Sequence, residues 1–260
     1  MQKRTTRIST YRIASTVFSR RKSKLPFANL LNWNGQSDAG ISLAVLKRER
    51  HAMQNFLLLK EAQIDQAMAE DEPLAIRKPP RTICSYRLDV FSSPMTQKRM
   101  AFVGDGQKLS DHATIFHNCP LKQVVVHQTQ ARRKTTGTYF ALALEIFDFD
   151  GDYFSMSIAL PEALTNDLQP GEIFKVDLNA RSEYPVESYL RLNTNDGPNR
   201  KDHSEQMKLS GKTERLNFDP QTLSANLNET YWLDLFLNDV AFNRITLDDL
   251  VIHRCRMSEL

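Results

Sequence analysis

The second half of the chain is dominated by short segments in which apolar and polar residues alternate. In residues 231–237 the odd positions are Tyr or Leu, whereas the even positions carry Trp232, Asp234 and Phe236. Successive side chains of a strand point to opposite faces, so this two-residue period predicts β-strands. Strands are predicted at 82–91, 99–103, 113–116, 123–128, 139–147, 153–159, 172–178, 186–192, 205–209, 214–218, 231–237 and 244–253.

Turn signals rich in glycine, aspartate and serine separate these segments, for example Gly104-Asp105-Gly106 and Ser210-Gly211-Lys212. Many short strands divided by such turns are typical of an all-β sandwich or barrel, not of parallel strands joined by helices. The sequence therefore predicts an antiparallel, jelly-roll-like β-sandwich, with one helical turn at 161–169.

A different period marks the chain before the proline pair Pro79-Pro80. Apolar residues recur every three, four or seven positions from Ser37 or Asp38 to about Glu70, which predicts a long amphipathic helix. Arg50 and Lys60 interrupt the heptad that a coiled coil needs. We expect the apolar stripe to be covered by the β-domain, a partner protein or a second copy of the chain, through Ile41, Val45, Met53, Phe56, Leu57 and Ile64.

These patterns divide the chain into four parts. Residues 1–24 form a basic arm that is expected to be disordered, and residues 25–72 form a helical segment that begins with a short helix at 25–33. A proline-rich linker occupies 73–81, since adjacent prolines favour extended backbone. The β-sandwich domain fills 82–260.

Composition and charge place the protein among soluble globular proteins, with 41% hydrophobic and 25% charged residues. No apolar run approaches the roughly 20 residues of a membrane span. Eight of the 34 Lys and Arg residues lie in the acid-free arm, so the remainder, with 31 acidic residues, is net acidic. We expect the arm to be solvated; the alternative is contact with anionic lipid or nucleic acid, through Arg20, Arg21, Lys22 and Lys24.

Three widely spaced cysteines and the absence of a secretory signal indicate a reducing compartment. The predicted location is the cytoplasm, with the periphery of the inner membrane as a second place. Because the N-terminus is rich in Arg and Ser, an organellar transit peptide is the remaining alternative.

Five segments in the second half of the chain resemble, in order, a known sandwich: GEIFKVDLNARS, PVESYLRLN, ERLNF, YWLDLFLND and ITLDDLVIHR. They are similar to the second half of a galactose-binding-like jelly roll, the fold of many carbohydrate-binding modules. A longer stretch, from about Ala113 to Leu260, resembles an uncharacterised alphaproteobacterial family of unknown function. That resemblance favours a bacterial setting and implies no activity.

The first resemblance implies a ligand site around the segment 186–192. Alternation puts Tyr189, Arg191 and Asn193 on one face of this strand and its leucines in the core. In carbohydrate-binding jelly rolls such a face stacks sugar rings on aromatics, while polar side chains bond the hydroxyl groups. The expected glycan site consists of Tyr184, Tyr189, Arg191, Asn193 and Asn195. A merely solvated sheet face is the alternative.

The densest acidic cluster is Asp148, Asp150 and Asp152, and Ca²⁺ prefers such oxygen ligands. The spacing does not fit an EF-hand, because Gly151 occupies the fourth position of the loop instead of the sixth. We therefore favour an Asp-Gly hairpin turn between the strands 139–147 and 153–159. No cofactor is predicted; Ca²⁺ at the three aspartates is the alternative.

Two further groups of residues contain side chains that are common in chemical sites. Asp248 and Asp249 are adjacent, so one faces the interior and needs a partner such as Arg191 or Arg244, or a metal. His117 and Cys119 share a strand face, as a nucleophile and its base would. However, no third orienting group or oxyanion donor accompanies them, and a free cysteine is usually a small core residue, so catalysis at this pair is disfavoured.

The sequence therefore predicts a non-catalytic binding protein with a jelly-roll-like module, and a glycan is the expected ligand class. One alternative is an adaptor that uses the basic arm on anionic membrane or nucleic acid. Another is a small carbohydrate-active enzyme, which is disfavoured because no carboxylate pair stands out in the sequence.

Overall fold

The computed structural model describes residues 43–70, 76–131, 138–196, 198–224, 226–227 and 229–257. Its chain divides into two compact units, 1–64 and 65–260, which are treated separately below. The predictions for the arm 1–24, for the helix 25–33 and for Ile41 lie outside the described residues.

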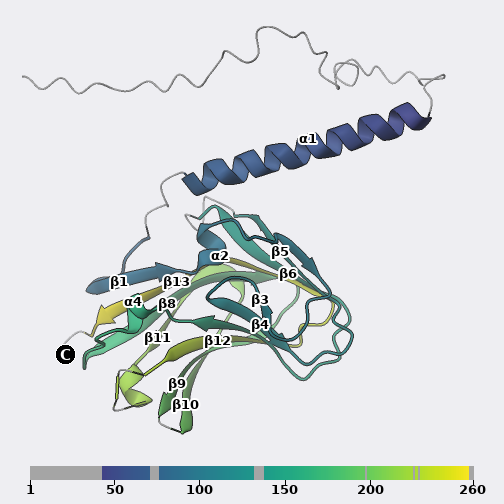
Figure 1. Ribbon diagram of the computed structural model, residues 1–260. Helices are drawn as coiled ribbons and strands as arrows, with labels where there is room; N and C mark the ends of the chain where they lie inside the picture. Colours follow the sequence, from purple (N-terminus) through teal and green to yellow (C-terminus); the bar gives the residue numbers. More distant parts are fainter. Residues whose placement is uncertain are drawn as a thin grey trace, which may run out of the picture. The chain divides into compact units, whose positions relative to one another are not determined.

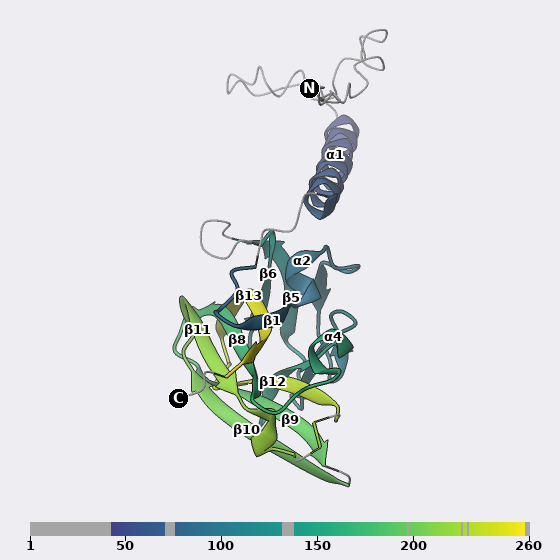
Figure 2. The ribbon, with the colours of Figure 1, turned by 90° about the vertical axis from the view of Figure 1, so that its left-hand side faces the viewer.

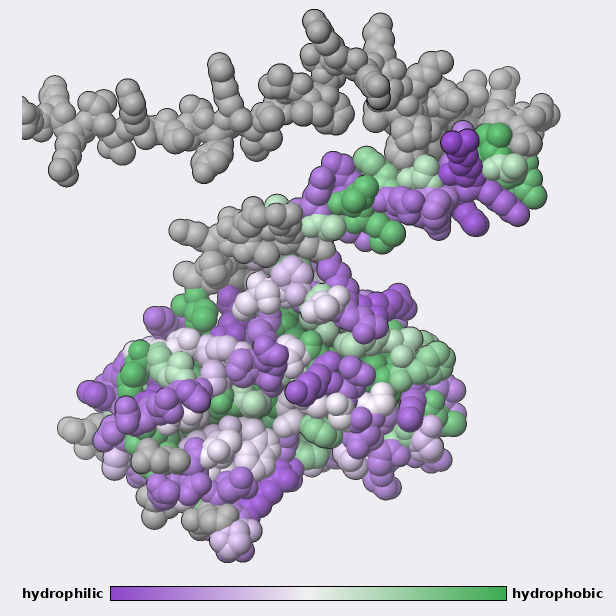
Figure 3. All heavy atoms as spheres, in the orientation of Figure 1, coloured by the Kyte–Doolittle hydropathy of each residue, from purple (hydrophilic) through white to green (hydrophobic). Residues whose placement is uncertain are grey.

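A long helix, α1 (Leu43–Glu70), lies where the sequence predicts one. Several of its apolar side chains are exposed, and Figure 3 shows hydrophobic and hydrophilic side chains mixed on its surface. Cover for Val45, Phe56, Leu57 and Ile64 by a partner stays a prediction. Within the part of the chain that the structure describes, no helix is long and apolar enough to cross a membrane.

Two antiparallel sheets build the unit 65–260, as the alternating pattern predicts (Figures 1 and 2). The seven-stranded sheet contains β1 (Thr82–Arg87), β2 (Arg99–Ala101), β5 (Val124–Gln130), β6 (Phe140–Ile146), β8 (Glu172–Ser182), β11 (Ser210–Phe218) and β13 (Asn243–Arg256). The six-stranded sheet contains β3 (Gln107–Lys108), β4 (Ala113–His117), β7 (Phe154–Ala159), β9 (Glu187–Asp196), β10 (Asn199–Met207) and β12 (Tyr231–Asn238).

The strand orders are β11-β8-β13-β6-β5-β2, with β1 also beside β13, and β10-β9-β12-β7-β4-β3. Successive strands repeatedly change sheet, as in a jelly roll. β12 lies between β9 and β7, which makes it a central strand of its sheet. The sandwich predicted from the sequence is therefore confirmed, with the short β3 as an addition that the pattern did not reveal.

Inward-facing residues of both sheets form one hydrophobic core. In β12 the odd positions from Tyr231 to Leu237 are buried, which leaves the even positions for the outer face. In β13 a bulge shifts the register between Leu247 and Asp249. Because of this extra residue, Leu247 and Leu250 both reach the core although they are three positions apart.

The first predicted strand ends earlier than expected, at Arg87, because the next residues form the short helix α2 (Asp89–Ser92). A distant side chain holds this turn in place: Gln128 Nε2 donates to Val90 O at 2.7 Å and to Ser93 O at 2.8 Å. The apolar residues Val90 and Phe91 are still buried, but from a helix. Tertiary contacts therefore override the local strand pattern here.

Two turn predictions are wrong. The segment 147–153 is not a hairpin, because β6 belongs to the seven-stranded sheet and β7 to the six-stranded one, so this loop crosses between sheets. Ser210-Gly211-Lys212 is not a turn between strands either; it lies inside β11. Gly211 has φ +75 and sits where the register with β8 shifts, a bulge that favours glycine.

The remaining elements are the helical turn α4 (Glu162–Thr165), which the sequence predicts, and the 3₁₀ turn η1 (Pro220–Thr222). The end of α4 is held by Arg254, whose guanidinium donates to the carbonyls of Asn166 and Asp167, both at 2.6 Å. Arg254 also pairs with buried Glu172, Nε to Oε2 at 2.7 Å. One buried arginine thus satisfies carbonyls that a helix end leaves open.

Candidate functional site

The outer face of the six-stranded sheet carries an unusual set of aromatic and charged side chains in cross-strand register. In the central rows Tyr189 lies opposite Phe236, Arg191 opposite Asp234, and Asn193 opposite Trp232. On the edge strand β10, Arg200 lies opposite Asn195. We call seven of these residues the outer-face site: Tyr189, Arg191, Asn193, Arg200, Trp232, Asp234 and Phe236.

Asp234 is the centre of a hydrogen-bond network. Its Oδ2 accepts from Arg191 Nη2 at 3.2 Å, Arg200 Nη2 at 3.0 Å and Asn193 Nδ2 at 3.0 Å. Asn193 Oδ1 in turn accepts from Arg200 Nη2 at 2.6 Å and Nε at 3.2 Å. Asp234 is 6% exposed and Asn193 0%. A carboxylate this buried needs a charged partner, and here two guanidinium groups supply it.

Three aromatic rings stand beside these charges. The rings of Tyr189 and Phe236 are stacked, with centroids 4.8 Å apart and planes at 10°. The guanidinium of Arg191 lies 4.4 Å from the Phe236 ring centroid, and that of Arg200 lies 5.0 Å from that of Trp232. Such cation–π contacts fix both arginines in place, so the face is organised before any ligand arrives.

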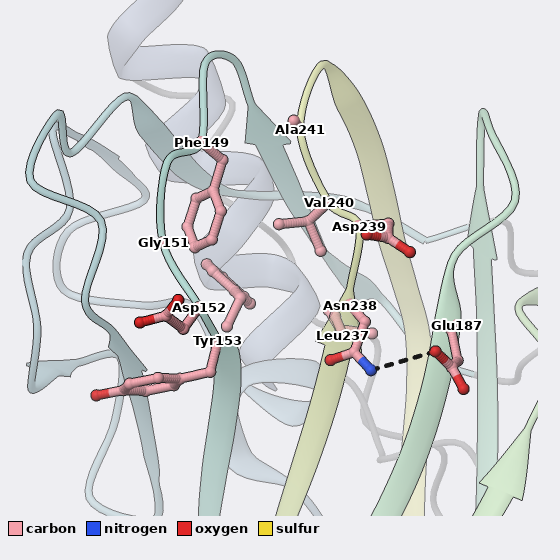
Figure 4. Close-up of a pocket in the computed structure, with 11 residues that line it drawn as sticks. Phe149, Gly151, Asp152, Tyr153, Glu187, Leu237, Asn238, Asp239, Val240 and Ala241 are labelled. Atoms are coloured by element: carbon pink, nitrogen blue, oxygen red, sulfur yellow. Dashed lines mark hydrogen bonds between the residues drawn. The ribbon is translucent and has the colours of Figure 1, made fainter.

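A pocket of about 430 Å³ opens at one end of this face (Figure 4). The outer face continues into this pocket. Asn238 is the next residue after Phe236 on the same face of β12, and it lies opposite Glu187 on β9. Asn238 Nδ2 donates to Glu187 Oε2 at 3.4 Å. The charged side chains that line the pocket are all acidic: Asp152, Glu187 and Asp239. It therefore offers acceptors to a ligand with hydroxyl or amino groups.

The wall of the pocket is built by close contacts in the loop before β7. A Cβ at Gly151 would lie 2.8 Å from Asn118 Oδ1 and 2.9 Å from Cys119 N, so a glycine is required. Asp152 is fixed by the same asparagine, whose Nδ2 donates to Asp152 Oδ2 at 2.9 Å. In Figure 4, Phe149 and Val240 lie on opposite sides of the pocket, on different loops.

His117 and Cys119 support this wall, and both are buried, as expected for the cysteine. His117 is 1% exposed, and its Nε2 donates to Val103 O at 2.8 Å. Its Nδ1 accepts from Cys119 N at 3.2 Å. With both ring nitrogens bound to backbone, the imidazole is not available as a base. Instead it stacks on Phe154, with ring centroids 6.0 Å apart.

The structure brings together only part of the glycan site predicted from the sequence. Tyr189, Arg191 and Asn193 share the outer face, and exposed Asn195 lies next to Arg200. Tyr184 precedes β9, and its backbone exchanges hydrogen bonds with the side chain of Asn243. Its place in the glycan site stays a prediction.

Four residues of the outer-face site were missed as site residues: Arg200, Trp232, Asp234 and Phe236. The sequence already places Trp232, Asp234 and Phe236 on one face of a strand. It does not reveal that this strand is the neighbour of β9, which only the sheet order decides. The alternating pattern predicts the strand after β9 only from residue 205, which places Arg200 in a loop, whereas β10 begins at Asn199.

The predicted acidic metal cluster gains no support from the geometry. Asp148, Asp150 and Asp152 lie in the crossover loop between sheets. Among the residues that the structure describes, no three His, Cys, Asp or Glu side chains are grouped so that they could hold a metal ion. The basic loop Arg132-Arg133-Lys134 lies outside the described residues.

The acidic pair of β13 is buried and paired with arginines, but with other partners than predicted. Asp249 binds Arg87 through two hydrogen bonds, Nε to Oδ1 at 3.0 Å and Nη2 to Oδ2 at 3.2 Å. Asp248 pairs with Arg181. Arg191 and Arg244, the predicted partners, lie beside Asp234 and Glu145 instead. Burial outweighs the effect of Arg87 and raises the pKa of Asp249 to about 6.

A serine, a histidine and an aspartate also meet on the seven-stranded sheet. His253 Nδ1 lies 2.8 Å from Ser85 Oγ, and its Nε2 lies 3.5 Å from Asp177 Oδ2. Asp177 is bound by Arg215 through two contacts of 2.6 Å, and these contacts hold the pKa of Asp177 at about 2 despite burial. Because His253 is 1% exposed, a substrate cannot reach its ring, and the group is structural.

Fold and site together define the class: an antiparallel β-sandwich protein with an aromatic, arginine-rich outer face that leads into an acidic pocket. The chain belongs to DUF6478, a family of unknown function, which matches residues 33–260. The predicted membership of a family of unknown function is therefore confirmed, whereas its alphaproteobacterial origin stays a prediction. No curated protein matches the chain.

Solved structures with a similar fold include carbohydrate-binding modules. The family 11 module from Clostridium thermocellum is 11% identical, with 60% of this chain and 95% of that one covered and a TM-score of 0.37. The CBM22-1 xylan-binding domain of Paenibacillus barcinonensis Xyn10C is 14% identical, with 70% and 100% covered and a TM-score of 0.37. The enzymatically active domain of bacteriophage CBA120 tailspike protein 4 is 10% identical, with 57% and 20% covered and a TM-score of 0.40. TM-scores this low transfer no ligand to this chain.

Proposed function

We propose that this protein binds a glycan across the outer face of its six-stranded sheet without altering it chemically. The observation that carries the proposal is the outer-face site itself: three aromatic rings and a buried Asp234 with two arginines on a solvent-facing sheet surface. Solvated sheet faces need none of these groups. Pre-organised polar groups next to aromatic surface are what sugar recognition requires.

The pocket extends this surface along the strands. From Trp232 to Asn238 the outer face follows β12 over six positions, which at about 3.3 Å per residue is about 20 Å. The arginine end offers donors and the pocket end offers acceptors. Sugar hydroxyl groups both donate and accept, so a short oligosaccharide satisfies both ends.

The test is saturable binding measured by calorimetry with a panel of neutral and acidic oligosaccharides. We expect one glycan class to bind the full chain, and Tyr189→Ala and Trp232→Ala to lower its affinity by at least tenfold. Phe102→Ala is the matched control, since Phe102 is 73% exposed and lies just after β2, the edge strand of the other sheet. Equal losses in all three variants, or no binding to any glycan, would contradict the proposal.

The carboxylates of the pocket make the enzyme alternative testable in the same samples. Binding without reaction predicts that no new reducing ends appear when the protein is incubated with the bound oligosaccharide. Release of reducing ends that is lost in Glu187→Gln would instead identify the pocket as a hydrolytic site.

A further inference from the structure

The aromatic rings of the outer-face site are already in contact with other groups. Phe236 contacts both the Tyr189 ring and the Arg191 guanidinium, and Trp232 has the Arg200 guanidinium beside it. A neutral sugar is usually held by stacking on a bare ring face. Here such a sugar has to displace a guanidinium or a neighbouring ring, which disfavours recognition by stacking alone.

Among the described residues, both arginines of the outer-face site have hydrogen-bond donors without an acceptor. The bonds to Asp234 and Asn193 use Nη2 of Arg191 and the Nε and Nη2 atoms of Arg200. In the described part of the chain the Nη1 groups of both arginines make no hydrogen bond, and Arg191 Nε is buried without an acceptor. The side chain of Arg200 is 47% exposed, so its donors are accessible to a ligand.

The charges at this point are also unbalanced, since two guanidinium groups share one oxygen of one carboxylate. In the other sheet Arg87 and Arg215 each bind their own carboxylate through two hydrogen bonds. Glu145 of that sheet is shared by Arg99 and Arg244, but only at 3.8 Å from each. Exposed Asp202 lies on the same face, opposite Asn193, but among the described residues it forms no ion pair with either arginine. The hydrogen-bonded network around Asp234 itself therefore contains two positive groups and one negative group.

We propose that the open donors of Arg191 and Arg200 bind the carboxylate of a uronic acid unit in the glycan, an inference that rests on the proposed function. A carboxylate matches the planar fork of an arginine, and charge-assisted bonds of this kind are about twice as strong as neutral ones. The acidic unit binds at the Arg191 and Arg200 end. The hydroxyl groups of the following units continue along β12 toward the acceptors of the pocket.

The test compares polygalacturonate with the same polymer after full methyl esterification, using the full chain. We expect the acidic form to bind at least about tenfold tighter, and its affinity to fall as salt is raised. Arg200→Gln and Arg191→Gln should each lower affinity for the acidic form to that for the ester. Arg99→Gln, which removes a 69% exposed arginine from the other sheet, should leave the preference unchanged.

The basic arm needs its own control, because it could attract any polyanion. A variant with Arg20, Arg21, Lys22 and Lys24 replaced by glutamine should keep the preference for the acidic polymer. Equal or tighter binding of the ester would overturn the uronate inference and leave the proposed function intact. Equal binding of dextran sulfate, or a preference lost with the arm and kept in Arg200→Gln, would also overturn it. Binding of neither polymer nor any neutral oligosaccharide would refute both.

Discussion

The outer faces of the two sheets use the same residue types in different arrangements. On the seven-stranded sheet, Arg87 binds Asp249 and Arg215 binds Asp177 through two hydrogen bonds each, and Arg99 and Arg244 both lie 3.8 Å from Glu145. On the six-stranded sheet, Arg191 and Arg200 share Asp234, and aromatic rings lie beside them. The two pairs with two hydrogen bonds each contribute to stability, whereas the sharing of Asp234 leaves arginine donors open for a ligand.

Burial also distinguishes the Arg87–Asp249 pair from the outer-face site. The Arg87 and Asp249 side chains are 8% and 11% exposed, while those of Arg191 and Arg200 are 23% and 47% exposed. Desolvating a charge costs free energy that only a good partner offsets, so loss of a partner is severe at the first pair. At the outer-face site the side chains of Arg191 and Arg200 reach solvent, so water can hydrate them when their carboxylate partner is removed. The four predictions below test this contrast, beginning with the largest effect.

The largest effect is expected from Asp249→Ala, which leaves the buried Arg87 without its carboxylate. We expect a loss of about 3 to 5 kcal/mol in the free energy of unfolding, measured by urea denaturation. Asp234→Ala is the comparison on the other face and should cost clearly less, about 1 to 2 kcal/mol, since its arginines reach solvent. Equal losses would mean that both faces are structural.

The next effect is a decline of stability with rising pH between about pH 4 and 6. The pKa of Asp249 is raised to about 6 by burial, so the folded state keeps a proton that the unfolded state has lost. The free energy of unfolding should fall by about 1.4 kcal/mol per pH unit over this range from this group alone. Asp249→Asn should remove that slope; an unchanged slope would assign it to other residues.

A smaller effect of opposite sign is expected at lower pH. Arg215 and His253 hold the pKa of Asp177 at about 2, below its unfolded value, so this carboxylate stabilises the fold above about pH 4. Stability should decrease as pH falls from about 4 to 2, by about 1 kcal/mol once solvent screening at exposed Arg215 is allowed for. Arg215→Gln should reduce this component in acid denaturation curves, since only His253 then lowers the pKa of Asp177, whereas Arg200→Gln should retain it in full.

The smallest effect on stability is expected from Arg200→Gln itself. Its side chain is half exposed and Arg191 still neutralises Asp234, so the free energy of unfolding should change by less than about 0.5 kcal/mol. The matched change Arg87→Gln should cost several times more. A large loss in Arg200→Gln would show that the outer-face site is needed for folding, and would weaken the case for a ligand.

How far the sequence predicts this protein depends on the range of the interaction. The sandwich and most strands follow from alternation, which is a local signal. Residues 88–91 belong to a strand in the sequence pattern. In the structure residues 89–91 lie in α2, because Gln128 holds this turn from a distant strand. The Asp150-Gly151 signal is local too, yet the loop crosses between sheets, and Gly151 is needed for close contact with Asn118.

The outer-face site divides in the same way. The sequence by itself determined the faces: it puts Tyr189, Arg191 and Asn193 together on one strand, and Trp232, Asp234 and Phe236 together on another, since side chains alternate with period two. Only the tertiary structure decided that β9 and β12 are neighbours in register and that β10 adds Arg200. Strand order depends on how the whole core is filled, and no local pattern records it.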